Sequence, residues 1–217
     1  MGVESTEIRY TKDLEGQKEF LNNGIFGESL LPFFDEKLKQ STIEDLRAKH
    51  PDIFQVNIGY MCNQTCEHCH VYAGPDRKEI MTKKDMDLCI EKIKEFGCKT
   101  VDITGGAPEM NPNFRYFVDE IRKLGELEII VRSNLTIILA NPKYHDLPKF
   151  FKEYNVRLIS SLPCYSEKNT DKQRGNGVFQ KSIKALKMLN EVGYGKDLIL
   201  DLVYNPGGAF LPPSQEK

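Results

Sequence analysis

The chain has 217 residues, and its 30 basic and 32 acidic side chains leave a formal net charge of −2 at pH 7. This near balance excludes the strongly basic surface by which proteins bind nucleic acids or anionic membranes. The length suits one domain, which would bury about 70% of the surface that its unfolded chain exposes.

Residues 1–49 are polar and charged, with weak helical patterns over 12–22 and 41–49. We expect them to form an N-terminal extension to a core domain over residues 50–217. Three apolar side chains are expected to pack the extension onto the core: Phe33, Phe34 and Leu38. The sequence has neither the run of ~18 apolar residues that a membrane span needs nor a secretory signal pattern. The expected location is therefore the cytoplasm, with no membrane or nucleic-acid partner.

A β-prone apolar run at 54–58 is followed directly by a loop that holds three of the six cysteines. Cys62, Cys66 and Cys69 have the spacing C-x3-C-x2-C. Thiolates are the usual ligands of iron–sulfur clusters, and a four-iron cluster normally takes four of them. With three from the loop, one iron keeps an open site that the amine and carboxylate of S-adenosylmethionine (SAM) can chelate. An electron from a reduced [4Fe-4S] cluster would then cleave a carbon–sulfur bond of SAM and release a 5′-deoxyadenosyl radical.

Other kinds of site are compatible with the same cysteines. Zinc could take the three thiolates together with His68 or His70 in a closed tetrahedral site. Cys66 and Cys69 also form a C-x-x-C pair of the thioredoxin type. A disulfide framework is disfavoured, because nothing in the chain indicates secretion.

Beyond the cysteines, helical and strand patterns alternate along the chain. Helices are predicted over 82–96, 113–124, 142–154 and 179–192, and strands over 54–58, 100–103, 127–131, 157–160 and 198–203. Thr82 begins the first helix with a capping-box pattern, Gly97 ends it, and Asn113 is expected to cap the next helix. Repeated strand–helix units imply an α/β fold with parallel strands joined by right-handed connections.

Either a β/α barrel or an open doubly wound sheet fits this alternation. The polar, glycine-rich segments GGAPE, RSN, SLP and YNPGG all follow the carboxyl ends of predicted strands, as the cysteines do. Active sites of β/α barrels lie on that side of the sheet. The pattern therefore favours a barrel-like arrangement.

Several of these strand-end residues are candidates for binding SAM. Gly105 and Gly106 would let strand-end carbonyls approach the ammonium group, with Glu109 as a further acceptor, although a plain turn explains two glycines equally well. Ser133 or Asn134 could hold the ribose hydroxyls. Further polar candidates follow the later strands: Ser160, Ser161, Tyr204 and Asn205.

Two arginines are candidates for a bidentate contact with the carboxylate of SAM. Arg132 directly follows the predicted third strand, and Arg174 lies in the segment before the last predicted helix. A guanidinium group matches the geometry of a carboxylate. An ordinary surface arginine is the alternative interpretation for each.

The remaining cysteines are isolated in the sequence. Cys89, Cys98 and His145 fit structural positions, since buried thiols behave as small apolar groups. Cys164 differs because it falls in the loop after the fourth strand, on the expected cofactor side. It is the candidate for holding a substrate near the radical, and a partly buried structural thiol is the alternative.

The ordered motifs resemble a known family. The cysteine spacing is the signature of the radical SAM superfamily, and CNQTCEHCHVYAGPDRKEIM resembles the arsenosugar biosynthesis radical SAM proteins in particular. Further matching segments follow in order: TGGAPEMNPNF, RSNLTIIL, SLPCY, QRGNGVFQKSI and LDLVYNPGGAFLPPSQ, so that the resemblance covers about residues 53–215. One position departs from the pattern, because Tyr72 stands where the family has an acidic residue.

The resemblance implies an incomplete barrel of about six β/α units and transfer of the 5′-deoxyadenosyl group to a methylated trivalent arsenical. Trivalent arsenic binds thiols, which would give Cys164 a role. An electron donor such as flavodoxin or ferredoxin is implied as a partner. A radical SAM enzyme acting on a peptide or another small molecule is one alternative, and a zinc-binding structural module without catalysis is another.

The resemblance also implies a sixth unit and a cysteine-containing C-terminal domain, which these 217 residues lack. We therefore expect a fragment or a reduced paralogue that is truncated after about the fifth strand. Such a sheet would expose an unpaired edge and an apolar barrel interior, and the chain would self-associate.

Overall fold

The computed structural model describes residues 34–41, 46 and 50–205. The chain divides into two compact units, Met1–Lys49 and His50–Lys217. The described part of the first unit contains one helix, α2 (Phe34–Lys39), which the sequence patterns did not predict. The predicted helix at 12–22 lies outside the described residues. Of the predicted helix at 41–49, only Ser41 and Leu46 are described, and neither is helical.

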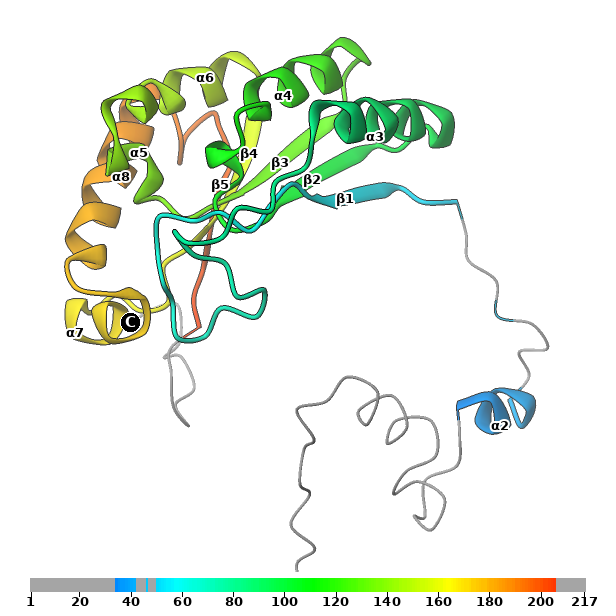
Figure 1. Ribbon diagram of the computed structural model, residues 1–217, viewed down its shortest axis with the longest axis horizontal. Helices are drawn as coiled ribbons and strands as arrows, with labels where there is room; N and C mark the ends of the chain where they lie inside the picture. Colours follow the sequence, from blue (N-terminus) through cyan, green and yellow to red (C-terminus); the bar gives the residue numbers. More distant parts are fainter. Residues whose placement is uncertain (1–33, 42–45, 47–49, 206–217) are drawn as a thin grey trace, which may run out of the picture. The chain divides into compact units, whose positions relative to one another are not determined.

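The second unit is built on a sheet of five parallel strands (Figure 1). The strands are β1 (Ile53–Asn57), β2 (Thr100–Thr104), β3 (Glu128–Ser133), β4 (Val156–Ser161) and β5 (Leu200–Val203). They pair in chain order, and the sheet does not close. All five predicted strands are thereby confirmed.

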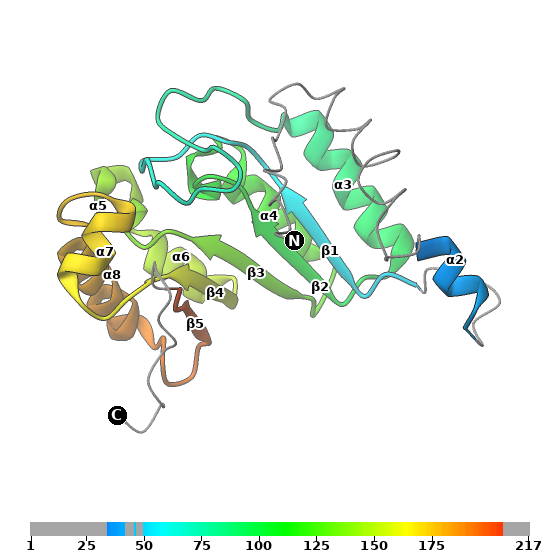
Figure 2. The same cartoon turned by 90° about the horizontal axis from the view of Figure 1, so that it is seen from below.

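Helices from the segments between the strands cover one face of this sheet (Figures 1 and 2). They are α3 (Lys83–Phe96), α4 (Phe114–Lys123), α6 (Leu147–Glu153) and α8 (Val178–Val192). In a doubly wound sheet the strand order reverses at a switch point, and helices cover both faces. Here the order never reverses among the described strands, so the fold is a partial barrel of the β/α type.

The ends of α3 agree with its sequence signals. The Thr82 hydroxyl accepts a hydrogen bond from the backbone N–H of Asp85, and the Asp85 carboxylate accepts one from the Thr82 N–H. Gly97 ends the helix in the left-handed conformation, with φ of 59°. Asn113 occupies the N-cap position of α4 as predicted, but its side chain makes no capping bond, and its own N–H donates to Oδ1 of Asn111 at 2.8 Å.

Several short elements are additions to the predicted pattern. They are η2 (Pro108–Met110), α5 (Ile137–Ala140), η3 (Pro142–Tyr144) and α7 (Glu167–Arg174). The single helix predicted at 142–154 is divided into η3 and α6. Asn141 caps η3 through its side chain, and Pro148 occupies the first turn of α6, where its missing N–H costs nothing.

The two faces of the sheet differ in their content of polar groups. Strand residues facing the helices are apolar and buried, including Val101, Ile103, Ile129, Val131 and Leu158. Side chains that alternate with them point to the other face. This open face, seen in Figure 2, carries hydrogen-bonded polar groups: Gln55, Asp102, Glu128, Arg132, Arg157 and Asp201.

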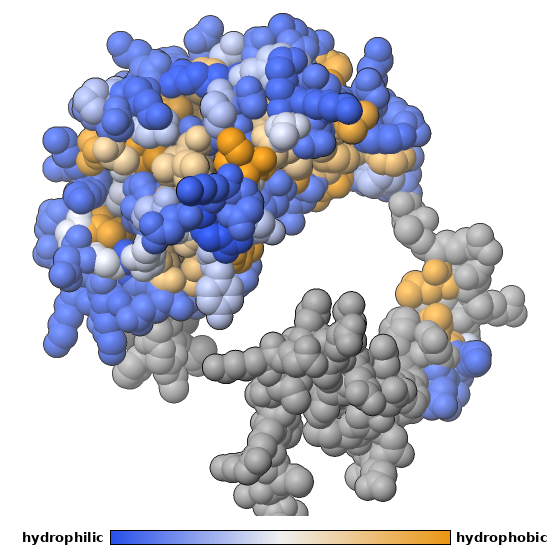
Figure 3. All heavy atoms as spheres, in the orientation of Figure 1, coloured by the Kyte–Doolittle hydropathy of each residue, from blue (hydrophilic) through white to orange (hydrophobic). Residues whose placement is uncertain are grey.

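The apolar barrel interior that we expect is only partly present in the described strands, because Ile130 and Ile159 share this face with the charged groups. Arg157 donates to Asp201 at 2.8 Å and to Glu128 at 3.0 Å, which links three strands through charged groups. A face of paired charges is hydrated readily and does not drive association by itself. The outer surface of the helices is also largely hydrophilic (Figure 3). Among the described helices, none combines the length and apolar character that crossing a membrane requires.

Candidate active site

The two ends of the loop that carries the cysteines are joined by backbone hydrogen bonds, and these joined ends form the closed base of the loop. The Tyr60 N–H donates to the Glu79 carbonyl at 2.9 Å, and the Met81 N–H donates to the Ile58 carbonyl, also at 2.9 Å. Higher in the loop, the Cys62 N–H donates to the Gly74 carbonyl at 3.1 Å. The ends of the loop are thus fixed to one another by backbone hydrogen bonds.

The two glycines after β2 hold this base against the sheet. The Gly106 N–H donates to the Gly59 carbonyl at 2.9 Å. A Cβ atom at Gly105 would lie 2.5 Å from the Gly59 carbonyl oxygen, and one at Gly106 would lie 2.5 Å from the Met61 carbonyl oxygen. Only glycine fits at these two positions. The close backbone approach that the sequence predicts for this turn therefore brings the turn against the start of the cysteine loop.

The three thiols of the loop line one cavity of about 290 Å³. Each sulfur has a different neighbour. The Asn134 side-chain amide lies 3.5 Å from Sγ of Cys62, the Ala73 N–H donates to Sγ of Cys69 at 3.3 Å, and Sγ of Cys66 donates to Oε1 of Gln64 at 3.7 Å. Burial raises the pKa of Cys62 and of Cys66, so these thiolates need a nearby positive charge or a metal.

Most of the predicted cofactor-binding residues line the same cavity. They are Gly105, Gly106, Arg132, Ser133, Asn134, Ser161, Arg174 and Asn205. The carboxyl ends of β2 to β5 and the segments after them supply these residues, as expected for a β/α barrel. The sequence therefore predicted correctly that thiols and strand-end polar groups meet at one place.

Several polar atoms of the cavity lining are buried without a partner in the described part of the chain. Ser133 Oγ, Arg174 Nε and Gln64 Nε2 are buried and have no hydrogen-bond partner among the described residues, and all three residues line the cavity. Such groups are suited to the hydroxyl, carboxylate and amine groups of SAM. The three thiols and these polar groups therefore fit a cluster with SAM beside it.

The zinc alternative is not supported. Across the described part of the chain, no three histidine, cysteine, aspartate or glutamate side chains are close enough to hold a single metal ion. A closed zinc site places all of its ligands about 2.0–2.3 Å from one ion. In a four-iron cluster, by contrast, each thiolate binds a different iron, so the sulfurs stand further apart.

Two of the cavity-lining residues also have partners within the protein. Arg132 binds the Asp102 carboxylate through two nitrogens, with the shortest contact at 2.8 Å, and Gln55 donates to the same carboxylate at 2.7 Å. The Asn134 amide also donates to Oδ1 of Asn63 at 2.7 Å, and its oxygen accepts from the Ile137 N–H at 3.0 Å. Arg132 thus links β3 to β2 on the open face, and Asn134 links the end of β3 to the cysteine loop.

Glu109 and Cys164 lie outside the cavity lining. Both carboxylate oxygens of Glu109 are buried without a well-formed hydrogen bond to any described residue, and burial raises its pKa to about 7, although the nearby Ser133 hydroxyl opposes that shift. Cys164 is buried, and its sulfur lies 3.4 Å from the Ser166 hydroxyl and 3.6 Å from the Asn169 amide. Burial alone would raise the pKa of Cys164, but these hydrogen bonds outweigh it and lower the pKa. Direct contact of either residue with a ligand stays a prediction.

Ser160 also lies outside the cavity lining, because it occupies the opposite face of β4 from Ser161. Its side chain is fully buried among the helices. Of the two candidate hydroxyls on this strand, the structure brings only Ser161 to the cavity.

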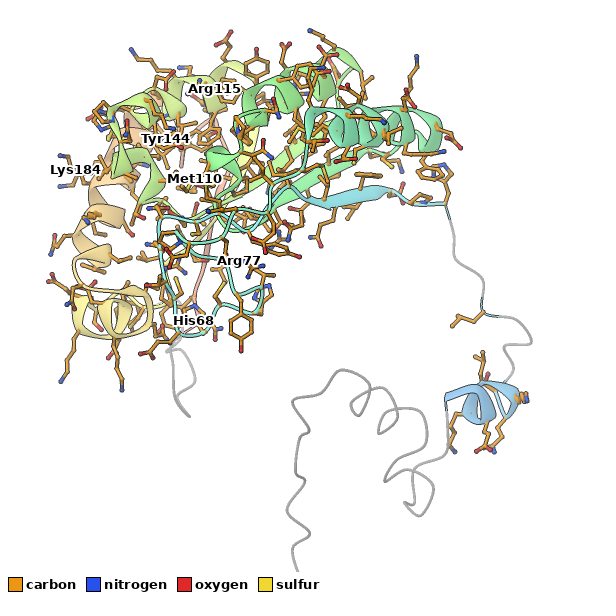
Figure 4. The ribbon with its side chains drawn as sticks, viewed as in Figure 1. His68, Arg77, Met110, Arg115, Tyr144 and Lys184 are labelled. Carbon is orange, nitrogen blue, oxygen red and sulfur yellow. The ribbon has the colours of Figure 1, made fainter. Side chains whose placement is uncertain are left out.

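Sequence reasoning missed Gln64 as a member of the site, and it considered His68 and His70 only as zinc ligands. All three line the cavity, and the labelled His68 lies on the cysteine loop near α7 (Figure 4). Burial, and then the charge of Arg174, lower the pKa of His68, which is therefore neutral at pH 7. A signal was available for Gln64, because it lies between two ligands on a short loop.

The family model of the radical SAM superfamily matches residues 56–207, which include the cysteine loop and all strand ends of the cavity. The chain belongs to the radical SAM superfamily. Its members are enzymes, and the family implies SAM and an iron–sulfur cluster as cofactors. The three thiols of the cavity are the residues of this radical SAM domain that fit the cluster.

Curated relatives of this radical SAM domain are named "Probable GTP 3′,8-cyclase". One from Saccharolobus islandicus is 26% identical over 152 residues, which are 70% of this chain and 45% of the relative. One from Sulfolobus acidocaldarius is 23% identical over 92 residues, which are 42% of this chain and 29% of the relative. The chain thus spans less than half the length of these relatives. They give no support to the finer resemblance to arsenosugar biosynthesis.

Solved structures agree on the fold of the domain. Streptococcus suis SuiB bound to its precursor peptide SuiA matches with a TM-score of 0.57 at 20% identity, covering 77% of this chain and 35% of that chain. The enzyme anSMEcpe with bound AdoMet matches with a TM-score of 0.57 at 14% identity, covering 71% and 43%. Likeness at this level of identity establishes the partial barrel and nothing further.

Proposed function

We propose that this protein holds a [4Fe-4S] cluster through Cys62, Cys66 and Cys69 and binds SAM against it for reductive cleavage. The observation that carries the proposal is that one cavity gathers the three thiols with polar groups from the strand ends. When bound, the cluster supplies the electron that cleaves SAM to a 5′-deoxyadenosyl radical. An electron donor such as flavodoxin or ferredoxin would reduce it.

The residues of the chain would bind and orient SAM. Arg174, whose Nε has no partner among the described residues, is suited to the carboxylate, and the unpartnered Ser133 hydroxyl is suited to another polar group of SAM. Ser161, which lines the cavity at the end of β4, is suited to a ribose hydroxyl. Asn134 would keep Cys62 in position through its amide. The turn at Gly105 and Gly106 would fix the cysteine loop, so that the loop is already ordered before a ligand binds.

For the substrate, we propose transfer of the 5′-deoxyadenosyl group to a methylated trivalent arsenical. The support is the ordered series of motifs over about residues 53–215. In this proposal Cys164, beside the site, would bind the arsenic. The curated relatives favour a second candidate, because their name specifies GTP, which would make a purine nucleotide the substrate.

One experiment tests the chemistry and separates the two substrates. The protein is reconstituted anaerobically with iron and sulfide, reduced, and incubated with SAM alone, with SAM and dimethylarsenite, or with SAM and GTP. We expect 5′-deoxyadenosine with SAM alone and an adenosylated arsenical, identified by mass, with the second mixture. A rearranged guanine nucleotide in the third mixture would replace the arsenical proposal with the nucleotide one. Failure to bind iron would contradict the proposal as a whole.

A further inference from the structure

Arg174 is a buried cation without a carboxylate partner. It ends α7, its exposed fraction is 7%, and among the described residues its only side-chain hydrogen bond runs from one terminal nitrogen to Oε1 of Gln64, at 2.9 Å. No described acidic side chain forms an ion pair with it. Arg132, which lines the same cavity, differs because Asp102 compensates its charge at 2.8 Å. Burial of an uncompensated charge is costly, so Arg174 needs negative charge from elsewhere.

The nearest source of negative charge in the proposed site is the cluster. Oε1 of Gln64, which accepts from Arg174, also accepts from Sγ of Cys66 at 3.7 Å. The backbone of the loop is attached to α7 as well, since the Glu67 N–H donates to the Gln173 carbonyl at 3.3 Å. Arg174 is therefore held next to one cluster ligand by contacts on both sides. In a buried site, charges at such close range interact strongly.

We propose that Arg174 is a positioning residue for the cluster, whose uncompensated positive charge stabilises the reduced state and raises the reduction potential before SAM binds. This inference rests on the proposed function. Each one-electron reduction, here by a chemical reductant such as dithionite, adds one negative charge to the cluster. Reduction potentials of iron–sulfur clusters depend on the net charge around them and on hydrogen bonds to their sulfurs. A fixed cation beside Cys66 makes that added charge less unfavourable.

The test is an anaerobic redox titration without SAM, followed by electron paramagnetic resonance of the reduced cluster. Arg174→Gln should shift the midpoint potential to a more negative value, and Arg174→Lys, which keeps the charge, should stay closer to the wild type. The matched control is the double variant Arg132→Gln/Asp102→Asn, which removes a compensated guanidinium from the same cavity without changing the net charge. Its midpoint potential should remain near that of the wild type.

Iron and sulfide are counted first in every sample. If the wild type takes up no cluster, the proposed function fails. If the wild type takes up a cluster but Arg174→Gln has the same potential, this inference fails alone. An equal shift in the Arg132/Asp102 control would also overturn it, as would a shift that occurs only with SAM present. Arg174→Met, whose unbranched side chain fills the same space, takes the place of Arg174→Gln if that variant does not fold.

Discussion

The two faces of the sheet differ in what their residues do. The face under the helices is apolar, and Ile103, Val131 and Phe151 are completely buried there or in the helices above. The open face mixes charged groups with isoleucines, and Asp102 and Arg132 are paired there across two strands. At the carboxyl ends of the strands lies the cavity, whose lining includes hydrogen-bond donors without partners among the described residues. The helical face therefore governs stability and the cavity governs chemistry, so substitutions on the two sides should separate these properties.

The largest expected effect is a complete loss of the cluster with little change in the fold. Cys66→Ala removes a thiol that lines the cavity and whose only side-chain hydrogen bond among the described residues runs to Gln64. We expect no bound iron after anaerobic reconstitution, with a circular dichroism spectrum like that of the wild type. Cys89→Ala is the control, because Cys89 lies on α3, outside the cavity lining. Retention of a full cluster by Cys66→Ala would refute the ligand assignment.

The opposite result is expected on the helical face. Phe151→Ala removes a ring with an exposed fraction of 0% that contacts Phe114 and Phe150. The free energy of unfolding should fall by about 3–5 kcal/mol, because a large cavity remains. Urea unfolding measures it, while iron content in the absence of urea should stay unchanged. Phe96→Ala, at a position 37% exposed, should cost much less.

Glu109 should make stability depend on pH. Its pKa is raised by burial from 4.5 to about 7, so between these values the folded protein keeps a proton that the unfolded chain releases. Stability should therefore fall as pH rises from 4.5 to 7, by an amount on the order of 2–3 kcal/mol. Glu109→Gln should remove this fall and be more stable than the wild type at pH 8 but not at pH 4. Parallel stability curves for the two proteins, measured by urea unfolding across pH, would contradict the assignment.

The smallest effect is expected for a charged pair on the open face. Asp102→Asn weakens the contact with Arg132, whose side chain is 43% exposed, and should cost about 1 kcal/mol in urea unfolding. The exposed pair of Lys92 and Glu95 is the comparison. Glu95→Gln should change stability by less than about 0.5 kcal/mol. Equal costs for the two variants would show that burial of Asp102 does not strengthen its pair.

The sequence predicted the elements whose patterns are long and locally determined. All five strands, and the helices α3, α4 and α8, follow from runs or periodic apolar residues, and Thr82 and Gly97 act where they were expected. The short elements α5 and α7 were missed. α5 has only four residues, and α7 is almost entirely polar, so neither shows helical periodicity.

The members of the candidate site could be predicted where their location follows from their position after a strand. Residues at strand ends must lie at one side of a parallel sheet, which accounts for seven of the eight proposed cofactor-binding residues that line the cavity with the thiols; the eighth, Arg174, comes from the end of α7. The burial of a side chain and the identity of its hydrogen-bond partners cannot be predicted from chain position in this way. Nothing near Arg132 shows that Asp102, thirty positions away, would bind it, and nothing near Glu109 shows that its carboxylate is buried.

The closed base of the cysteine loop has a consequence for metal uptake. Bringing the ends of a flexible loop together costs conformational entropy, and in many small metal sites the ion itself must overcome that cost, so that binding and folding are one event. Here backbone bonds such as those from Tyr60 to Glu79 and from Met81 to Ile58 already join the ends. Iron and sulfide therefore enter a loop that the sheet has already closed. Removal by a chelator should be reversible at ordinary temperature, with the rest of the domain still folded to receive the cluster again.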